Sequence, residues 1–139
     1  MLVLAASEPG EPVKGDSIAA AQEIPLPFLE NILAELRHQG LVHSRRGQEG
    51  GYWLAMEAKD ITVAEVIRAV EGPLATVRGE SADDLAYSGE ASGLKDVWLS
   101  LRGSVRGVLE NVTLAQVLAG DVSRPAPEKG AEAAPLGDG

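Results

Sequence analysis

Residues 40–54, Gly-Leu-Val-His-Ser-Arg-Arg-Gly-Gln-Glu-Gly-Gly-Tyr-Trp-Leu, contain the full pattern of a two-stranded hairpin. Gly40 is typical of the residue that follows a helix end. Two short β-type runs come next, Val42 to Arg45 and Tyr52 to Leu54, and a glycine-rich turn connects them. Glycines in such a turn accept positive φ, which tight hairpins need. The stretch therefore predicts an antiparallel hairpin with cationic side chains near its tip.

A turn and an amphipathic helix are predicted just before the hairpin, between Ile24 and Gln39. Apolar residues recur there with the i, i+3, i+4, i+7 spacing of one buried helix face, at Leu29, Ile32, Leu33 and Leu36. Pro27 suits the first turn of this helix, where its missing N–H costs little. A short helix from Asp16 to Gln22 precedes the turn. Two helices followed at once by a basic hairpin form the layout of a winged helix, a fold that mostly binds DNA.

The rest of the chain is predicted to alternate between helices and irregular segments. Leu2 to Ala6 has the character of the last turns of a helix, and further helices are expected over residues 63–70, 94–110 and 113–119. Thr62, followed three residues later by Glu65, predicts a capping box. The fold class is therefore mainly α with a small two-stranded β wing. The expected domains are 1–72, a winged helix-turn-helix; 73–93, a connector or sensor loop; 94–120, dimerisation helices; and 121–139, a disordered tail.

The predicted helix from Leu94 to Glu110 carries a broad apolar stripe. Such a helix is too apolar to remain solvated, and the simplest partner is a second copy of the chain. We therefore expect a homodimer, with this helix as its interface. The residues of the stripe are Leu94, Val97, Trp98, Leu101, Val105, Val108 and Leu109.

The composition excludes several classes of site. The chain has 139 residues, no cysteine and two histidines, so disulfides, thiolate metal sites and a structural zinc site are all ruled out. No apolar run approaches the length of a membrane span, and we expect a cytoplasmic protein without a membrane partner. No nucleophile–base pair, phosphate loop or paired carboxylates are visible, so an enzyme is not expected.

The charge distribution matters more than the net charge of −9, which by itself argues against nucleic-acid binding. Between Arg37 and Gln48 the charged residues are all arginines, two histidines lie beside them, and there is no acid. A cationic patch on an acidic body can bind DNA, with weak and strongly salt-sensitive non-specific affinity.

From Ile18 to Gly72 the chain resembles the Rrf-two family of bacterial winged-helix regulators. Each matching piece is short, but together they stand in order and at family spacing. The pieces are Ile-Ala-Ala-Ala-Gln-Glu-Ile-Pro at 18–25, Phe-Leu-Glu-Asn-Ile-Leu at 28–33, Leu-Arg-His-Gln-Gly-Leu-Val at 36–42, Ser-Arg-Arg-Gly at 44–47, Gly-Gly-Tyr at 50–52 and Ile-Thr-Val-Ala-Glu-Val-Ile-Arg-Ala-Val-Glu-Gly at 61–72. The similarity continues more loosely to about Gly120.

The resemblance implies a homodimer that places its second helix in the major groove and its wing in the minor groove. Glu30 and Asn31 match positions that face base edges, where a carboxylate can accept from cytosine and an amide can pair with adenine. Arg46 matches the wing arginine of the minor groove. Arg37, Arg45 and Gln48 are candidate phosphate contacts. Two alternatives stay open: Glu30 as an acid favoured by the helix dipole, and Asn31 as solvated surface.

The chain departs from the family pattern in three ways. Cluster-binding members carry cysteines in the loop before the long helix, whereas residues 73–93 here have neither Cys nor His, so no cysteine-ligated iron–sulfur cluster is expected. Pro27 replaces a hydrogen-bonding residue at the helix start, which changes the expected sequence preference. The first helix is shorter than in the family, and its loss predicts an exposed apolar groove.

The leading interpretation is a homodimeric, sequence-specific transcription factor, most simply a repressor, that uses no cofactor. Regulation is expected from a small-molecule effector or a partner enzyme, and the cysteine-free branch of the family points to sulfur or cysteine metabolism. The alternative is a winged-helix interaction module that has lost DNA binding, which the net charge and Glu49 at the wing tip favour.

Overall fold

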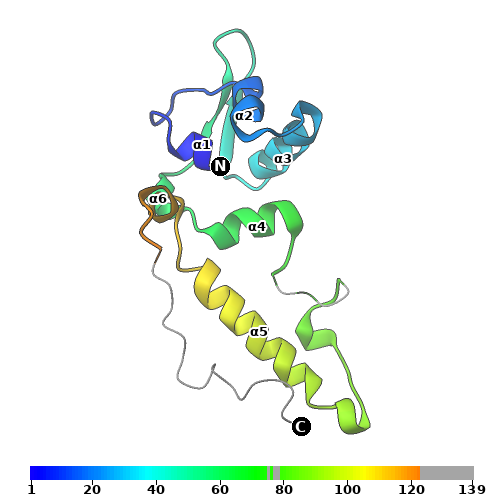
Figure 1. Ribbon diagram of the computed structural model, residues 1–139. Coiled ribbons are helices and arrows are strands. Elements are labelled where there is room, and N and C mark those ends of the chain that lie inside the picture. Colours follow the sequence, from blue (N-terminus) through cyan, green and yellow to red (C-terminus); the bar gives the residue numbers. More distant parts are fainter. Residues whose placement is uncertain (75, 77–78, 123–139) are drawn as a thin grey trace.

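The computed structural model describes residues 1–74, 76 and 79–122 (Figure 1). Of the predicted disordered tail, residues 121–139, the part from residue 123 onward lies outside the described residues. Within them, the α-helices are α1 (Leu2–Ala5), α2 (Gly15–Gln22), α3 (Leu26–His38), α4 (Val63–Glu71), α5 (Leu94–Leu109) and α6 (Leu114–Ala119). Three 3₁₀ turns complete the helical part: η1 (Ala58–Asp60), η2 (Ala82–Asp84) and η3 (Gly89–Ala91).

The hairpin predicted from the glycine-rich stretch is confirmed. Strand β1 (Val42–Arg45) pairs antiparallel with β2 (Gly51–Leu54), and Val42 lies opposite Leu54. A feature that the sequence did not reveal is a third backbone partner: Val13 exchanges two N–H···O bonds of 2.8 Å with Tyr52. The loop before α2 is therefore fastened to the wing, which supports the wing where it leaves the body.

The apolar stripe of α3 forms the centre of the core. Leu29, Leu33 and Leu36 are 2–4% exposed. Ile32, the fourth residue of the stripe, is partly buried against the same cluster. The other buried members come from every neighbouring element: Leu4, Ile18, Ala19, Leu41, Val42, Ile61 and Leu114. Because α3 buries one face on this core, its opposite face is fixed toward solvent.

The helix ends follow the predicted signals with one correction. Gly40 has φ +78°, as a residue after a helix end requires, and the Leu41 N–H donates to the Leu36 carbonyl at 3.0 Å. Thr62 caps α4 by accepting from the Glu65 N–H at 3.2 Å, but the reciprocal bond from the Glu65 side chain is not formed. The complete capping box lies instead at α6, between Thr113 and Gln116. At α4 the Glu65 carboxylate accepts from the Thr62 hydroxyl at 3.4 Å and not from the Thr62 backbone N–H.

Helix α5 projects away from the winged domain, and the chain returns to that domain at α6 (Figure 1). Two backbone bonds close the base of this excursion, from the Val63 N–H to the Val112 carbonyl (2.8 Å) and from the Leu114 N–H to the Ile61 carbonyl (2.9 Å). Arg68 of α4 also forms an ion pair with Glu110 at the end of α5. The excursion is therefore anchored at its base.

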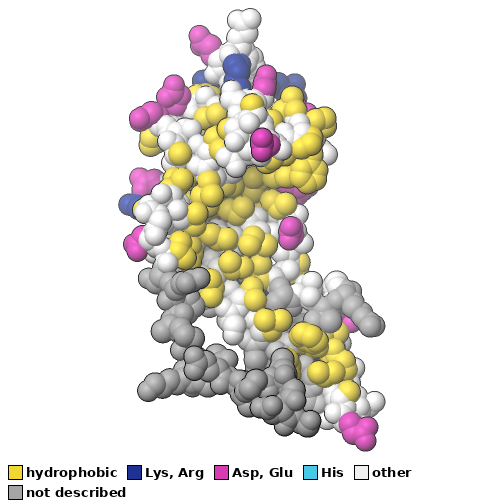
Figure 2. Space-filling model, in the orientation of Figure 1, with side chains coloured by type: hydrophobic (Ala, Val, Ile, Leu, Met, Phe, Trp, Pro, Cys, Tyr) yellow, Lys and Arg dark blue, Asp and Glu magenta, His cyan; other side chains and the backbone are white. Residues whose placement is uncertain are grey.

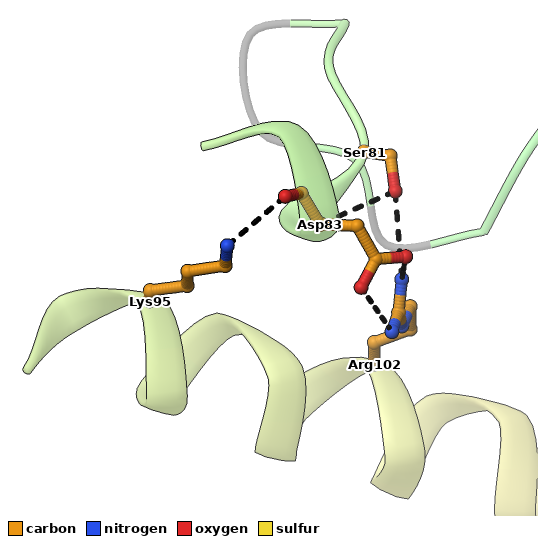
Figure 3. Close-up of polar contacts among 4 residues, drawn as sticks. All are labelled: Ser81, Asp83, Lys95 and Arg102. Atoms are coloured by element: carbon orange, nitrogen blue, oxygen red, sulfur yellow. Dashed lines mark hydrogen bonds and ion pairs between the residues drawn. The ribbon is translucent and has the colours of Figure 1, made fainter. Parts of the chain in front are cut away.

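The connector between α4 and α5 is held to one face of α5 by polar side chains (Figure 3). Arg102 binds both carboxylate oxygens of Asp83, at 2.7 and 3.2 Å, and Lys95 donates to the Asp83 carbonyl at 3.0 Å. Trp98 donates its indole N–H to the Tyr87 hydroxyl at 2.8 Å. The Arg102 guanidinium lowers the pKa of the Asp83 carboxyl. Lys95, Trp98 and Arg102 therefore define a connector face of α5.

The other face of α5 is apolar and exposed. Leu94, Val97, Leu101 and Val108 are 41–54% exposed, and the helix has no buried residue. Their spacing places them on one side of the helix, away from the connector face. Of the predicted dimerisation residues, these four are the most exposed. Trp98 faces the connector, and Val105 and Leu109 are half-buried.

A groove with almost wholly apolar walls lies among α1, α3, α4 and α6. Its volume is about 450 Å³, and its lining includes Leu4, Leu29, Ile32, Val66 and Val117. Figure 2 shows hydrophobic side chains gathered over the middle of the molecule. The sequence predicted exposed apolar surface beside the first helix, and this groove lies there. In the described residues, no helix is long and apolar enough to cross a membrane.

Candidate nucleic-acid interface

The solvent face of α3 carries the predicted base-reading residues. Pro27, Glu30 and Asn31 are exposed, with the i, i+3, i+4 spacing of one helix face, and Arg37 lies exposed in the last turn. They share a face because the leucines of the same helix are buried on the opposite side. The helix is therefore oriented so that its N-terminal polar residues can contact another surface.

The tip of the wing presents the predicted cationic residues. Arg45, Arg46, Gln48 and Glu49 are all exposed. The turn is narrow at Gly50, where an added Cβ would lie 2.1 Å from the Arg45 carbonyl oxygen. Figure 2 shows the Lys and Arg side chains at this end of the molecule interspersed with acidic ones. The local charge is thus mixed rather than uniformly basic.

A side-chain bond joins the helix to the wing. The Arg37 guanidinium donates to the Ser44 hydroxyl of β1 at 3.2 Å. Because strand residues alternate, His43 and Arg45 project from the face of β1 opposite to Ser44. There the Arg45 guanidinium lies 6.0 Å from the Trp53 ring, and the His43 ring lies 5.8 Å from it.

The alternation also separates the two aromatic residues of β2. Tyr52 packs against the hydrophobic core, and Trp53 contacts the outer face of β1. The structure thus brings Pro27, Glu30, Asn31 and Arg37 onto the α3 side. It directs Arg45 toward Trp53 on the outer face of the wing.

One exposed residue of α3 was not identified as a candidate from the sequence. Phe28 is 60% exposed, and Leu26 beside it is 37% exposed. The signal was present: Phe28 lies one position before the buried stripe that begins at Leu29. A large aromatic residue outside the stripe in the first turn of a helix is predicted to face solvent.

The fold and this surface define a winged helix-turn-helix protein. The family description "Iron-dependent Transcriptional regulator", of the Rrf2 family, matches residues 1–120. The chain belongs to the Rrf2 family of transcriptional regulators.

Similar proteins point the same way. The chain is 51% identical over 120 residues to a Mycobacterium tuberculosis protein provisionally named an HTH-type transcriptional regulator, covering 86% of this chain and 74% of that protein. It is 35% identical to the regulator CymR of Bacillus subtilis, over 82% of this chain and 78% of CymR. The structure of CymR, described as the global cysteine regulator of B. subtilis, matches with a TM-score of 0.71 at 31% identity, covering 85% and 86% of the two chains. The structure of IscR from T. potens matches with a TM-score of 0.68 at 37% identity, covering 86% of this chain and 77% of that one.

The iron in the family description does not fit the donor set of this chain. The sequence has no cysteine, and thiolates are the usual ligands of iron–sulfur clusters. Among the described residues, no group of three or more His, Asp or Glu side chains is placed to hold a metal ion. We therefore assign no step of regulation to iron.

Proposed function

We propose that this protein is a sequence-specific DNA-binding repressor that acts as a homodimer. In this proposal residues 1–72 bind DNA, residues 73–93 connect, and residues 94–120 pair the two copies. The observation that carries the proposal is the bond between Arg37 and Ser44 at 3.2 Å, because it holds the polar face of α3 and the wing on one surface. A helix and a wing fixed together can contact adjacent grooves of a duplex.

The proposed contacts divide by chemistry. Glu30 and Asn31 lie in the N-terminal half of α3, the part of a recognition helix that meets base edges. Asn31 can pair with adenine and Glu30 can accept from a cytosine amino group. Pro27 has no N–H, so it offers shape rather than a hydrogen bond at the helix start.

Arg46 is proposed to enter the minor groove, because it stands at the wing tip and no intrachain partner is described for its side chain. Arg37, Arg45 and Gln48 are proposed to bind phosphates, which position the protein without reading sequence.

The second copy is proposed to pack on the exposed face of α5. Four large apolar side chains on one side of a projecting helix are costly in water. Because they are 41–54% exposed in the single chain, burial in a dimer adds about half of the roughly 1.5–3 kcal/mol that full burial of such a side chain contributes. A two-fold axis at α5 would place two α3 helices on one side of a duplex, with half-sites about one or two helical turns apart.

The regulated genes are proposed to belong to sulfur or cysteine metabolism, because a similar structure is that of a cysteine regulator. A small molecule or a partner enzyme would supply the signal, since thiolate chemistry is absent. On this proposal, fragments of the source genome bound by the protein lie upstream of such genes.

The test is a selection of duplexes from a random library by the purified protein, followed by mobility-shift titrations at low and moderate salt. We expect Arg46→Ala to weaken binding and to reduce the slope of log affinity against log salt by about 2, close to 1 for the arginine of each subunit. Arg106→Ala removes a similarly exposed arginine on α5 and should change neither. Absence of any bound duplex at low salt, or an unchanged Arg46→Ala titration, would contradict the proposal and favour a protein-interaction module.

A further inference from the structure

Phe28 is an aromatic side chain that the core does not use. It is 60% exposed, more than any other large hydrophobic side chain among the described residues, although it lies next to Leu29, which is 4% exposed. Leu29, Leu33 and Leu36 already fill the buried side of α3. An exposed ring at this position therefore contributes little to the stability of the domain. Together with its exposed neighbours Leu26 and Pro27 it forms a contiguous apolar surface, and such surfaces mark contact sites.

The position of Phe28 directs the ring toward the end of α3 that would meet DNA. It stands in the first turn, and the base-reading candidate Asn31 lies three residues later, on the neighbouring part of the helix surface. In an α-helix each Cα–Cβ bond tilts toward the N-terminus, so the ring extends past its own Cα in that direction. Its neighbours Pro27 and Leu26 are also exposed and apolar. The leading turn of the helix is thus an apolar tip on an otherwise polar face.

The apolar surface formed by Leu26, Pro27 and Phe28 complements only an apolar group on the major-groove edge of a base pair. A phenyl ring has no donor or acceptor to offer a phosphate or a polar base atom. The thymine C5-methyl is the apolar group that a base pair presents in the major groove, and Phe is among the side chains that contact it. We propose that Phe28 contacts a thymine methyl group and so sets a preference for thymine at one position of each half-site. This inference rests on the proposed function, since it needs α3 to enter the major groove.

The experiment replaces methyl groups of the DNA one at a time. A duplex selected by the wild-type protein is resynthesised with deoxyuridine in place of each thymine, which removes the methyl and keeps the base pair. For wild-type protein we expect one position per half-site at which affinity falls about four-fold, the value of one buried carbon group at about 0.8 kcal/mol. Substitution in both half-sites should lower affinity roughly fifteen-fold if the two contacts are independent.

The same duplexes are then titrated with variants. Phe28→Ala should bind the thymine duplex more weakly and lose the sensitivity to deoxyuridine at that position, whereas Phe28→Tyr keeps the ring and should keep the sensitivity. Met56→Ala is the matched control, because Met56 is an exposed apolar residue (42%) outside α3. It should respond to deoxyuridine as the wild type does. Far-UV circular dichroism and light scattering on each variant check that fold and mass are unchanged.

The outcomes separate this inference from the proposed function. If the wild type binds selected duplexes but no single deoxyuridine lowers its affinity, or if Phe28→Ala keeps the full sensitivity, the methyl contact is overturned while DNA binding stands. If Phe28→Ala instead changes the mass in solution and leaves DNA binding untouched, Phe28 belongs to a protein interface. If no duplex binds at low salt, the proposed function and this inference both fail.

Discussion

Gly50 is the residue at which the shape of the wing is most sharply constrained, and Gly50→Ala tests that shape. The residue is buried, its N–H donates to the Gly47 carbonyl at 3.0 Å, and its φ is not in the left-handed region. The constraint is therefore steric. A Cβ built there lies 2.1 Å from the Arg45 oxygen and 2.8 Å from the Arg45 and Arg46 carbonyl carbons. Because these atoms are backbone, they cannot rotate away as the end of a side chain can.

The loss of stability caused by Gly50→Ala depends on which backbone atoms must move. The backbone has to open by about 1 Å to restore an ordinary contact, which breaks the bond from Gly50 and loosens the pairing of Arg45 with Gly51. Each lost backbone bond is worth about 1 kcal/mol net, and residual strain adds a similar amount. A loss of about 2–3 kcal/mol lowers the Tm of a domain of this size by roughly 10 °C. We also expect weaker DNA binding, since Arg46 leaves its place.

Thermal unfolding followed by circular dichroism measures the Tm, and amide exchange of Tyr52 measures the wing locally, because its N–H donates to Val13 at 2.8 Å. Gly103→Ala is the matched control: it adds the same methyl inside α5, where nothing lies within 4 Å, and should raise stability by up to about 1 kcal/mol. If Gly50→Ala leaves both the Tm and the Tyr52 exchange rate at wild-type values, the described turn is wrong.

Three further changes have distinct signatures. Thr113→Ala removes the hydroxyl of the capping box at α6 and should lower the free energy of unfolding by about 1 kcal/mol in urea titrations, with Ser at the same position retaining most of it. Asp83→Asn should lower the Tm at neutral pH. Because the bond from Arg102 lowers the pKa of Asp83 in the folded protein, this contribution to stability is present above the ordinary carboxyl pKa of 3.8 and is lost as the pH falls through the lower folded pKa. The difference in Tm from wild type should therefore vanish in acid. Leu101→Asp places a charge on the exposed apolar face of α5 and should reduce the mass measured by light scattering from twice 14.5 kDa to 14.5 kDa. Ser100→Asp places the same charge at an exposed neighbouring position and should leave the mass unchanged. A wild-type monomer at micromolar concentration would contradict the α5 interface.

The parts of the fold that the sequence predicted are those with local signals. The spacing of Leu29, Leu33 and Leu36 and the glycines after Arg46 are short-range patterns, and the structure has a helix and a hairpin there. The pairing of Val13 with Tyr52 was not predictable, because a single bridge between distant segments has no period.

The candidate site divides in the same way. The exposure of Glu30, Asn31 and Arg46 followed from periodicity and turn chemistry. The orientation of Trp98 could not be predicted from the sequence, because an apolar stripe on a helix does not indicate which of its residues face a loop and which remain exposed. Its bond to Tyr87 depends on where the connector folds back. The exposure of Phe28 follows from the same periodicity, because Phe28 lies one position before the buried stripe of α3.

The two backbone bonds at the base of the excursion have a consequence for how this chain can change. The bonds of Val63 with Val112 and of Leu114 with Ile61 hold the two ends of the excursion together. The entropy cost of closing a loop between fixed ends grows only slowly with the length of the loop. Insertions, deletions or a wholly different sequence between α4 and α6 should therefore leave the winged domain intact. The segment between α4 and α6 could therefore be exchanged for a different dimerisation unit while the winged domain keeps its fold.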